Sequence, residues 1–200
     1  MGECKAALEE AGNDFEKAQD ILREKGQAAA AKRAGRSTSE GAAMVAFSSD
    51  HTKAAGVVLE SETDFVATNE NFRELTMKLA TGFVTTDPGT DPNAQTIDGK
   101  AVSTLVEEGV ALMRENIQLK KAVQVSAPFV GGYIHHDRKS AALVCFNGTH
   151  EKAEEIAKFV GMQVVSLRPT FLNKDEIPAE VIEKEYDLQK RRAIEEGKPE

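Results

Sequence analysis

The sequence has no tryptophan, few other aromatic residues and no long apolar run. Aromatic side chains make up 6% of its 200 residues, which predicts cores built mostly from Ala, Val, Leu and Ile. No segment approaches the roughly 18 apolar residues of a membrane-spanning helix, and the N-terminus lacks the basic and apolar regions of a signal peptide. We therefore expect neither a membrane protein nor a secreted precursor.

Cysteine is also scarce. Cys4 and Cys145 lie far apart, and neither has the spacing of a disulfide framework or a metal site. Both are interpreted as reduced thiols that serve packing, which is typical of the cytosol or of an organelle matrix.

Basic residues are outnumbered by acidic ones, and the formal net charge is -8. Phosphate contacts need clustered Lys and Arg, so direct nucleic-acid binding is not expected and a protein partner fits better. The nucleotide-cradling patterns GxxxxGK[ST] and GxGxxG are both missing. We expect no bound cofactor.

The N-terminal part predicts two short helices within residues 3–25. Gly12 suits the end of the first helix and Asp14 suits the N-cap of the second, which we expect to end at Gly26. Residues 27–41 mix helix formers with glycines and hydroxyls, which indicates a partly helical linker.

From Ala42 the pattern changes to short apolar runs and longer helices. "AAMVAFSS" and "AAGVVLES" predict a hairpin, and a helix follows with Phe72, Leu75, Leu79 and Phe83 on one face. That helix gives way to "TTDPGTDPNAQTIDG", which predicts a long surface loop. A further helix and the alternating strand "IQLKKAVQV" complete this part.

A second hairpin, "APFVGGYIHHDRKSAALVCFNG", is followed by another helix, for which Thr149 is the expected N-cap. A hairpin with a helix thus occurs twice. The sequence predicts an α+β fold with two small units of antiparallel sheet and helices in tandem, residues 42–126 and 127–200.

Candidates for catalysis or metal binding are weak. Cys145 and His135 fall on one predicted hairpin and could form a thiolate pair, but "ALVCF" favours a buried, inert thiol. His135, His136 and Asp137 could ligate a metal, yet adjacent residues on a strand point to opposite faces. We expect neither an enzyme nor a metal site.

The stretch "TDFV", Thr63 to Val66, joins a strand to a helix. From the residues alone, the commoner structure has Thr63 or Asp64 as a cap and Phe65 packed inward as a staple, with Asn69 capping the helix that follows. The alternative is that Asp64 and Phe65 project outward as a polar and aromatic anchor for a partner.

Several segments in order resemble translation elongation factor Ts. "ETDFVATNENF" is similar to the signature of that family, although Thr68 stands where a basic residue is common. "CKAALEEAGNDFEKAQDILREKG" resembles its N-terminal helical module, which is related to ubiquitin-associated domains. "GGYIHHDRKSAALV" resembles its second hairpin, with Asp137 and Arg138 where a glycine-containing turn is usual.

The resemblance implies a guanine-nucleotide exchange factor without covalent catalysis, working in the bacterial cytoplasm or an organelle matrix. Its partner would be elongation factor Tu, GDP-bound or nucleotide-free. Thr63, Asp64, Phe65 and Val66 would form the exchange wedge, with His135 and His136 as a second contact.

The resemblance also implies that the chain is partial. Residues 1–26 match a helical module that lacks its first helix, and residues 127–200 match a subdomain truncated before a helical hairpin and a closing strand. A homodimer of the full-length protein is a further expectation. An adaptor built on the N-terminal module, and a thiol hydrolase using Cys145 and His135, are the alternative functions.

Overall fold

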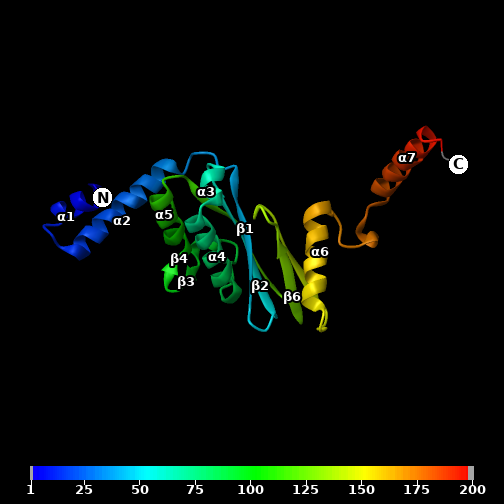
Figure 1. The fold of residues 1–200 in the computed structure, drawn as a ribbon, viewed down its shortest axis with the longest axis horizontal. Coiled ribbons are helices and arrows are strands. Elements are labelled where there is room, and N and C mark those ends of the chain that lie inside the picture. The colour runs from blue at the N-terminus through cyan, green and yellow to red at the C-terminus, as the bar shows by residue number, and fades with distance from the viewer. Residues whose placement is uncertain (1, 198–200) are drawn as a thin grey trace. The chain divides into compact units, whose positions relative to one another are not determined.

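A computed structural model describes residues 2–197 of the chain (Figure 1). Two helices come first, α1 (Gly2–Glu10) and α2 (Phe15–Arg33). Gly12 lies at φ +64° in the turn between them, as expected, and the Asp14 carboxylate accepts a hydrogen bond from the backbone N–H of Lys17 at 3.1 Å. The predicted N-cap is therefore confirmed.

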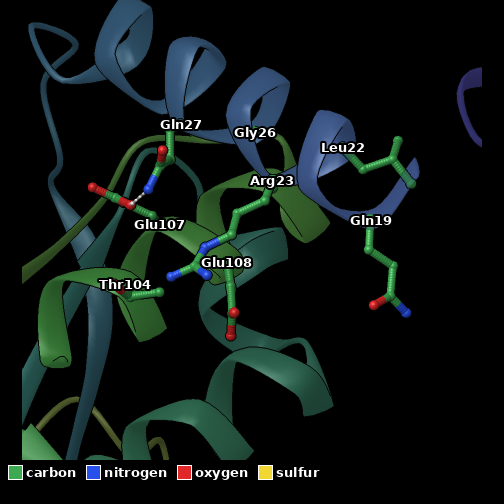
Figure 2. A pocket seen from close by; sticks show the side chains of 9 residues that line it. Gln19, Leu22, Arg23, Gly26, Gln27, Thr104, Glu107 and Glu108 are labelled. Carbon is green, nitrogen blue, oxygen red and sulfur yellow. Dashed lines mark hydrogen bonds between the residues drawn. The ribbon is translucent and has the colours of Figure 1, made fainter. Parts of the chain in front are cut away.

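The prediction that the second helix ends at Gly26 is wrong. α2 runs through Gly26 to Arg33, because the glycine serves packing there instead of termination. A Cβ at Gly26 would lie 3.3 Å from the Cβ of Ala111 on α5 (Val102–Met113), so the missing side chain lets the two helices approach closely. Gln27 then donates a hydrogen bond to Glu107 at 3.2 Å across the shallow pocket between them (Figure 2).

The first sheet is antiparallel, with the order β1-β2-β5. β1 (Glu40–Phe47) and β2 (Lys53–Ser61) form the predicted hairpin, and β5 (Ile117–Ser126) is the predicted alternating strand. α4 (Glu70–Thr85) and α5 pack on one face of this sheet (Figure 1). The largest fully buried side chains of the core lie between these layers: Leu59, Phe72, Leu79 and Phe83.

The second hairpin packs on the opposite face of that sheet. It consists of β6 (Phe129–Ile134) and β7 (Ala141–Phe146), as predicted. A Cβ at Gly56 of β2 would lie 3.6 Å from the side chains of both Leu143 and Val45, which places β7 against this face. Because the sheet is covered on both sides, four consecutive residues of β1 are buried.

Residues 86–101 are more ordered than the predicted surface loop. They contain a 3₁₀ turn (Pro92–Ala94) and a small ribbon of β3 (Thr96–Ile97) and β4 (Lys100–Ala101). Ile97 is only 2% exposed and packs directly on Gly82 of α4. One apolar side chain therefore anchors this connection to the core.

The helix after the second hairpin is α6 (Ala153–Leu167), and its predicted N-cap at Thr149 is wrong. The helix begins four residues later, where the backbone N–H groups of Lys152 and Ala153 donate to the ring nitrogen and the carbonyl of His150. α6 packs on the hairpin through small residues, since Ala157 lies against Gly131 and Gly161 against Tyr133.

The chain divides into two compact units between Ser166 and Leu167. The first holds the N-terminal helices, the three-stranded sheet and the second hairpin, so the split into subdomains 42–126 and 127–200 stays a prediction. The second holds a 3₁₀ turn (Lys174–Glu176) and α7 (Ala179–Glu195). Among residues 2–197, no helix is both long and apolar enough to cross a membrane.

Candidate functional site

The TDFV corner follows directly from the end of β2. Thr63 is the N-cap of the short helix α3 (Asp64–Thr68), and its hydroxyl accepts a hydrogen bond from the N–H of Val66 at 3.4 Å. Ser61, which is fully buried, donates its hydroxyl to the carbonyl of Thr63 at 3.0 Å. Val66 packs against the core and Ala67 is buried, so the inner side of the corner is fixed.

Asp64 and Phe65 form the outer side of the corner. The Phe65 side chain is 83% exposed, and Asp64 is exposed beside it. The interpretation of Phe65 as an inward staple is therefore wrong, whereas Asn69 does cap the next helix by accepting from the N–H of Asn71 at 2.9 Å. A large apolar ring held in water on a fixed backbone is suited to burial by a partner.

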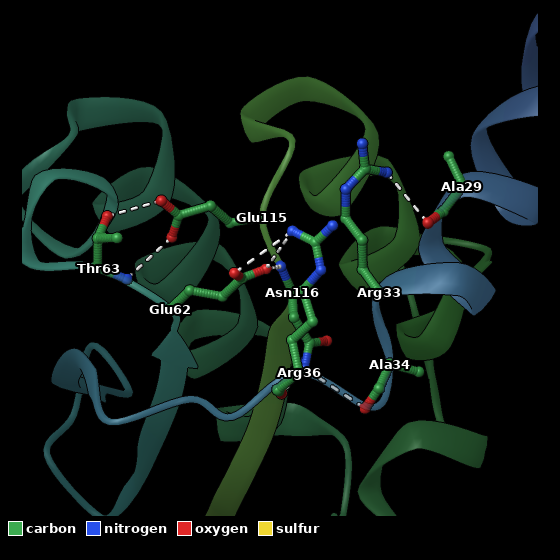
Figure 3. A network of polar contacts seen from close by, with 8 residues as sticks. All are labelled: Ala29, Arg33, Ala34, Arg36, Glu62, Thr63, Glu115 and Asn116. Carbon is green, nitrogen blue, oxygen red and sulfur yellow. Dashed lines mark hydrogen bonds and ion pairs between the residues drawn. The ribbon is translucent and has the colours of Figure 1, made fainter.

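Glu115 braces the corner from the segment just before β5, whose first residue, Ile117, pairs with Ser61 at the end of β2 (Figure 3). Its carboxylate accepts from the backbone N–H of Thr63 at 3.0 Å and from the Thr63 hydroxyl at 2.6 Å. It lies in the connection between α5 and β5, directly after Arg114, which closes α5 in the left-handed conformation at φ +62°. Sequence reasoning missed Glu115, because no local pattern links residues so far apart in the chain.

Glu62 and Asn116 extend this network (Figure 3). The Glu62 carboxylate accepts from the backbone N–H of Asn116 at 2.7 Å and pairs with the Arg36 guanidinium at 3.4 Å. Asn116 is only 3% exposed and donates its side-chain amide to the carbonyl of Arg36 at 2.6 Å. The segment after α2, the end of β2 and the start of β5 are thereby tied together next to Thr63.

His135 and His136 lie in the turn that follows β6, and not on the strand itself. Their ring centroids are 4.2 Å apart, so the expectation that they point to opposite faces is wrong. The Tyr133 hydroxyl lies 3.0 Å from the Nδ1 atom of His135, which is half-buried, whereas His136 is exposed. Within residues 2–197, no group of three or more His, Cys, Asp or Glu is arranged to hold a metal ion.

The β6–β7 turn reaches the start of β1, at the same end of the sheet as the TDFV corner. The carbonyl of Arg138 accepts from the N–H of Ala43 at 2.7 Å, and Lys139 pairs with Glu40 at 2.6 Å. The hydrogen bond and charge of Glu40 raise the pKa of Lys139 above its usual value, and the negative charge of Asp64 adds to this effect. The structure thus brings the second hairpin and the corner close together.

Cys145 is exposed on β7, and Cys4 is exposed as well, so the expectation of two packing thiols is wrong. Cys145 pairs with Val130 on β6, and His135 lies five residues further along. At about 3.3 Å per residue, the backbone positions of Cys145 and His135 are separated by roughly 16 Å along the hairpin, which is too far for a thiolate pair. The hydrolase alternative therefore has no geometric basis.

Comparisons with known proteins identify the family of this chain. The family model described as "Elongation factor TS" matches residues 62–200. Curated proteins named "Elongation factor Ts" are similar along the whole chain. The protein from Aquifex aeolicus is 36% identical over 100% of this chain and 73% of its own length, and that from Thermobifida fusca is 39% identical with the same coverage. The protein from Halothermothrix orenii is 37% identical over 99% of this chain and 69% of its own length. The chain belongs to the elongation factor Ts family and is a protein of translation elongation.

Proposed function

We propose that the protein binds elongation factor Tu in its GDP-bound and nucleotide-free forms and promotes the release of GDP. The observation that carries this proposal is Phe65, an aromatic side chain that is 83% exposed on a corner braced by Glu115. A solvated wedge with a rigid base loses little conformational freedom when it enters a partner. Family membership supplies the class of partner.

The mechanism needs no covalent step. A guanine nucleotide is held by Mg²⁺ and by backbone N–H groups around its phosphates, so displacing those elements weakens its binding. In this proposal Phe65 is the apolar wedge, Asp64 is the polar contact that positions it, and Thr63 and Val66 hold the corner. By linkage, GDP must weaken the binding of this protein by the same factor, and incoming GTP displaces it.

His135 and His136 are proposed as a second contact with elongation factor Tu. Tyr133 orients the His135 ring, and the turn that carries both rings is attached to β1 through Lys139 and Glu40. A partner seated on the corner would therefore meet a second, separately anchored element. This function places the protein in the bacterial cytoplasm or an organelle matrix, and a homodimer of the full-length protein stays a prediction.

The test is the rate at which a fluorescent GDP derivative leaves elongation factor Tu, with and without this protein and with excess unlabelled GDP. We expect release to accelerate and to saturate as the protein concentration rises. Tight binding with no acceleration would instead favour an adaptor, and would overturn the exchange function.

A further inference from the structure

A groove of about 480 Å³ lies beside the TDFV corner, between α4, β1 and the β6–β7 turn. Met44, which is 2% exposed, and Met77 provide flexible apolar walls. Thr68, the last residue of α3, also lines the groove, so the groove is continuous with the helix that carries Asp64 and Phe65. Two arginines, Arg73 and Arg138, supply positive charge.

Arg138 has an unusual backbone conformation. Its φ is +59°, in the left-handed region that favours glycine over residues with a Cβ. The backbone cannot relax, because the Arg138 N–H donates to the carbonyl of His135 at 2.8 Å and its carbonyl accepts from Ala43 at 2.7 Å. Glycine would form this turn with less strain, so the strained arginine points to a role for its guanidinium outside the turn.

Arg73 is incompletely satisfied by the protein itself. Its Nε atom is buried and has no hydrogen-bond partner among the described residues. Buried N–H groups are nearly always paired, so an acceptor from outside the chain would remove an energetic penalty here. Among the ion pairs of residues 2–197, none involves Arg73 or Arg138.

Glu70 and Glu74 also line the groove and offset the charge of the two arginines. A polyanion would be repelled by these carboxylates, whereas a single carboxylate can approach the guanidinium groups. The methionines suit an apolar side chain next to that carboxylate, because thioethers adapt to irregular shapes. The lining therefore selects a partner segment with one acid beside an apolar residue.

We infer that this groove binds a segment of elongation factor Tu that carries one carboxylate beside an apolar side chain. The carboxylate accepts from Arg73 and Arg138, and the apolar group contacts Met44 and Met77. The inference rests on the proposed function, since it extends the same interface from the TDFV corner along α3. It adds positively charged contacts, from Arg73 and Arg138, to the acidic Asp64 of the corner.

The substitution Arg138→Gly tests the inference, because it removes the guanidinium and relieves the backbone strain. We expect the protein concentration that gives half-maximal GDP release to rise about tenfold at low salt. The half-maximal concentrations of Arg138→Gly and wild type should come within about threefold of each other near 1 M salt, where charge interactions are screened. Arg168→Gly is the matched control, since Arg168 is also exposed and left-handed, at φ +48°, and we expect it to behave as wild type.

Arg73→Met provides a second test that separates binding from folding. It removes the unpaired Nε atom but keeps an apolar stem, so we expect an unchanged or higher free energy of unfolding. The affinity for elongation factor Tu should fall about as much as in Arg138→Gly. Suppose that wild type accelerates GDP release and that both variants have the same half-maximal concentration as wild type. This result would overturn the proposed binding in the groove and leave the exchange function intact. No acceleration by wild type would overturn both.

Discussion

The carboxylate of Glu115 accepts two hydrogen bonds from Thr63, one from the backbone N–H at 3.0 Å and one from the hydroxyl at 2.6 Å. Thr63 in turn caps the helix on which Asp64 and Phe65 are exposed. A residue between α5 and β5 therefore fixes the direction in which the corner projects. If the corner acts as a wedge, its effect on GDP release depends on the contact between Glu115 and Thr63. A mobile corner would have to be ordered on binding, and the entropy cost of that ordering would weaken binding.

Replacement of Glu115 should weaken both the fold and exchange. Glu115→Ala leaves the half-buried N–H of Thr63 unpaired and removes the acceptor of the Thr63 hydroxyl, and we expect a loss of about 1–3 kcal/mol in the free energy of unfolding. Urea unfolding measures that loss, and GDP release at a temperature where the variant stays folded measures the effect on exchange. Glu107→Ala is the control, because Glu107 on α5 accepts an exposed hydrogen bond from Gln27 on α2, away from the corner. Equal exchange rates for the two folded variants would contradict the role of the brace.

The packing of Ile97 on Gly82 predicts a specific effect on stability. A Cβ at Gly82 would overlap the Ile97 side chain, so Gly82→Ala should lower the free energy of unfolding by about 1–3 kcal/mol. Gly148→Ala is the control, because nothing lies within 4 Å of its Cβ position. Thermal unfolding compares the two. If Gly82→Ala is as stable as Gly148→Ala, the 86–101 segment is not anchored as described.

Asp50 predicts a pH dependence for the β1–β2 turn. Hydrogen bonds from the Ser48 hydroxyl, at 2.6 Å, and from the N–H and hydroxyl of Thr52 lower its pKa from 3.8 to about 2. Because the folded pKa lies below the unfolded one, the charged carboxylate stabilises the fold above about pH 4. This stabilisation is lost as the pH falls through about 2.

NMR titration of the Asp50 side-chain carboxyl measures that pKa directly. In unfolding experiments, wild type should exceed Asp50→Asn in stability at pH 5, and the difference should shrink toward pH 2. A titration midpoint near the ordinary value for aspartate would show that the turn does not hold the carboxylate in this way.

Local patterns predicted most of the elements. Alternation in "IQLKKAVQV" predicted β5, and the caps at Asp14 and Asn69 follow from side chains that accept from N–H groups a few residues away. The error at the end of α2 arose because a distant segment decided the outcome. Gly26 packs closely against Ala111, on a helix far along the chain, and so does not end α2.

The candidate site also combines features that the local sequence predicts with features that depend on contacts between distant segments. The TDFV residues are visible in the sequence, but the brace by Glu115 and the groove with Arg73 and Arg138 arise only when remote segments meet. The pattern of "ALVCF" could not reveal that Cys145 is exposed, because period-two alternation does not say which face a partner layer covers.

The central claim is tested most directly by the rate of fluorescent GDP release from elongation factor Tu in the presence of Phe65→Ala. The side chain is 83% exposed, so the variant should fold with a stability within about 0.5 kcal/mol of wild type. Phe159→Ala, at a phenylalanine 57% exposed on α6, is the matched control and should keep wild-type rates. We expect Phe65→Ala to slow stimulated release by about tenfold or more, as for the loss of an interface anchor. A folded Phe65→Ala protein that releases GDP at the wild-type rate would contradict the account.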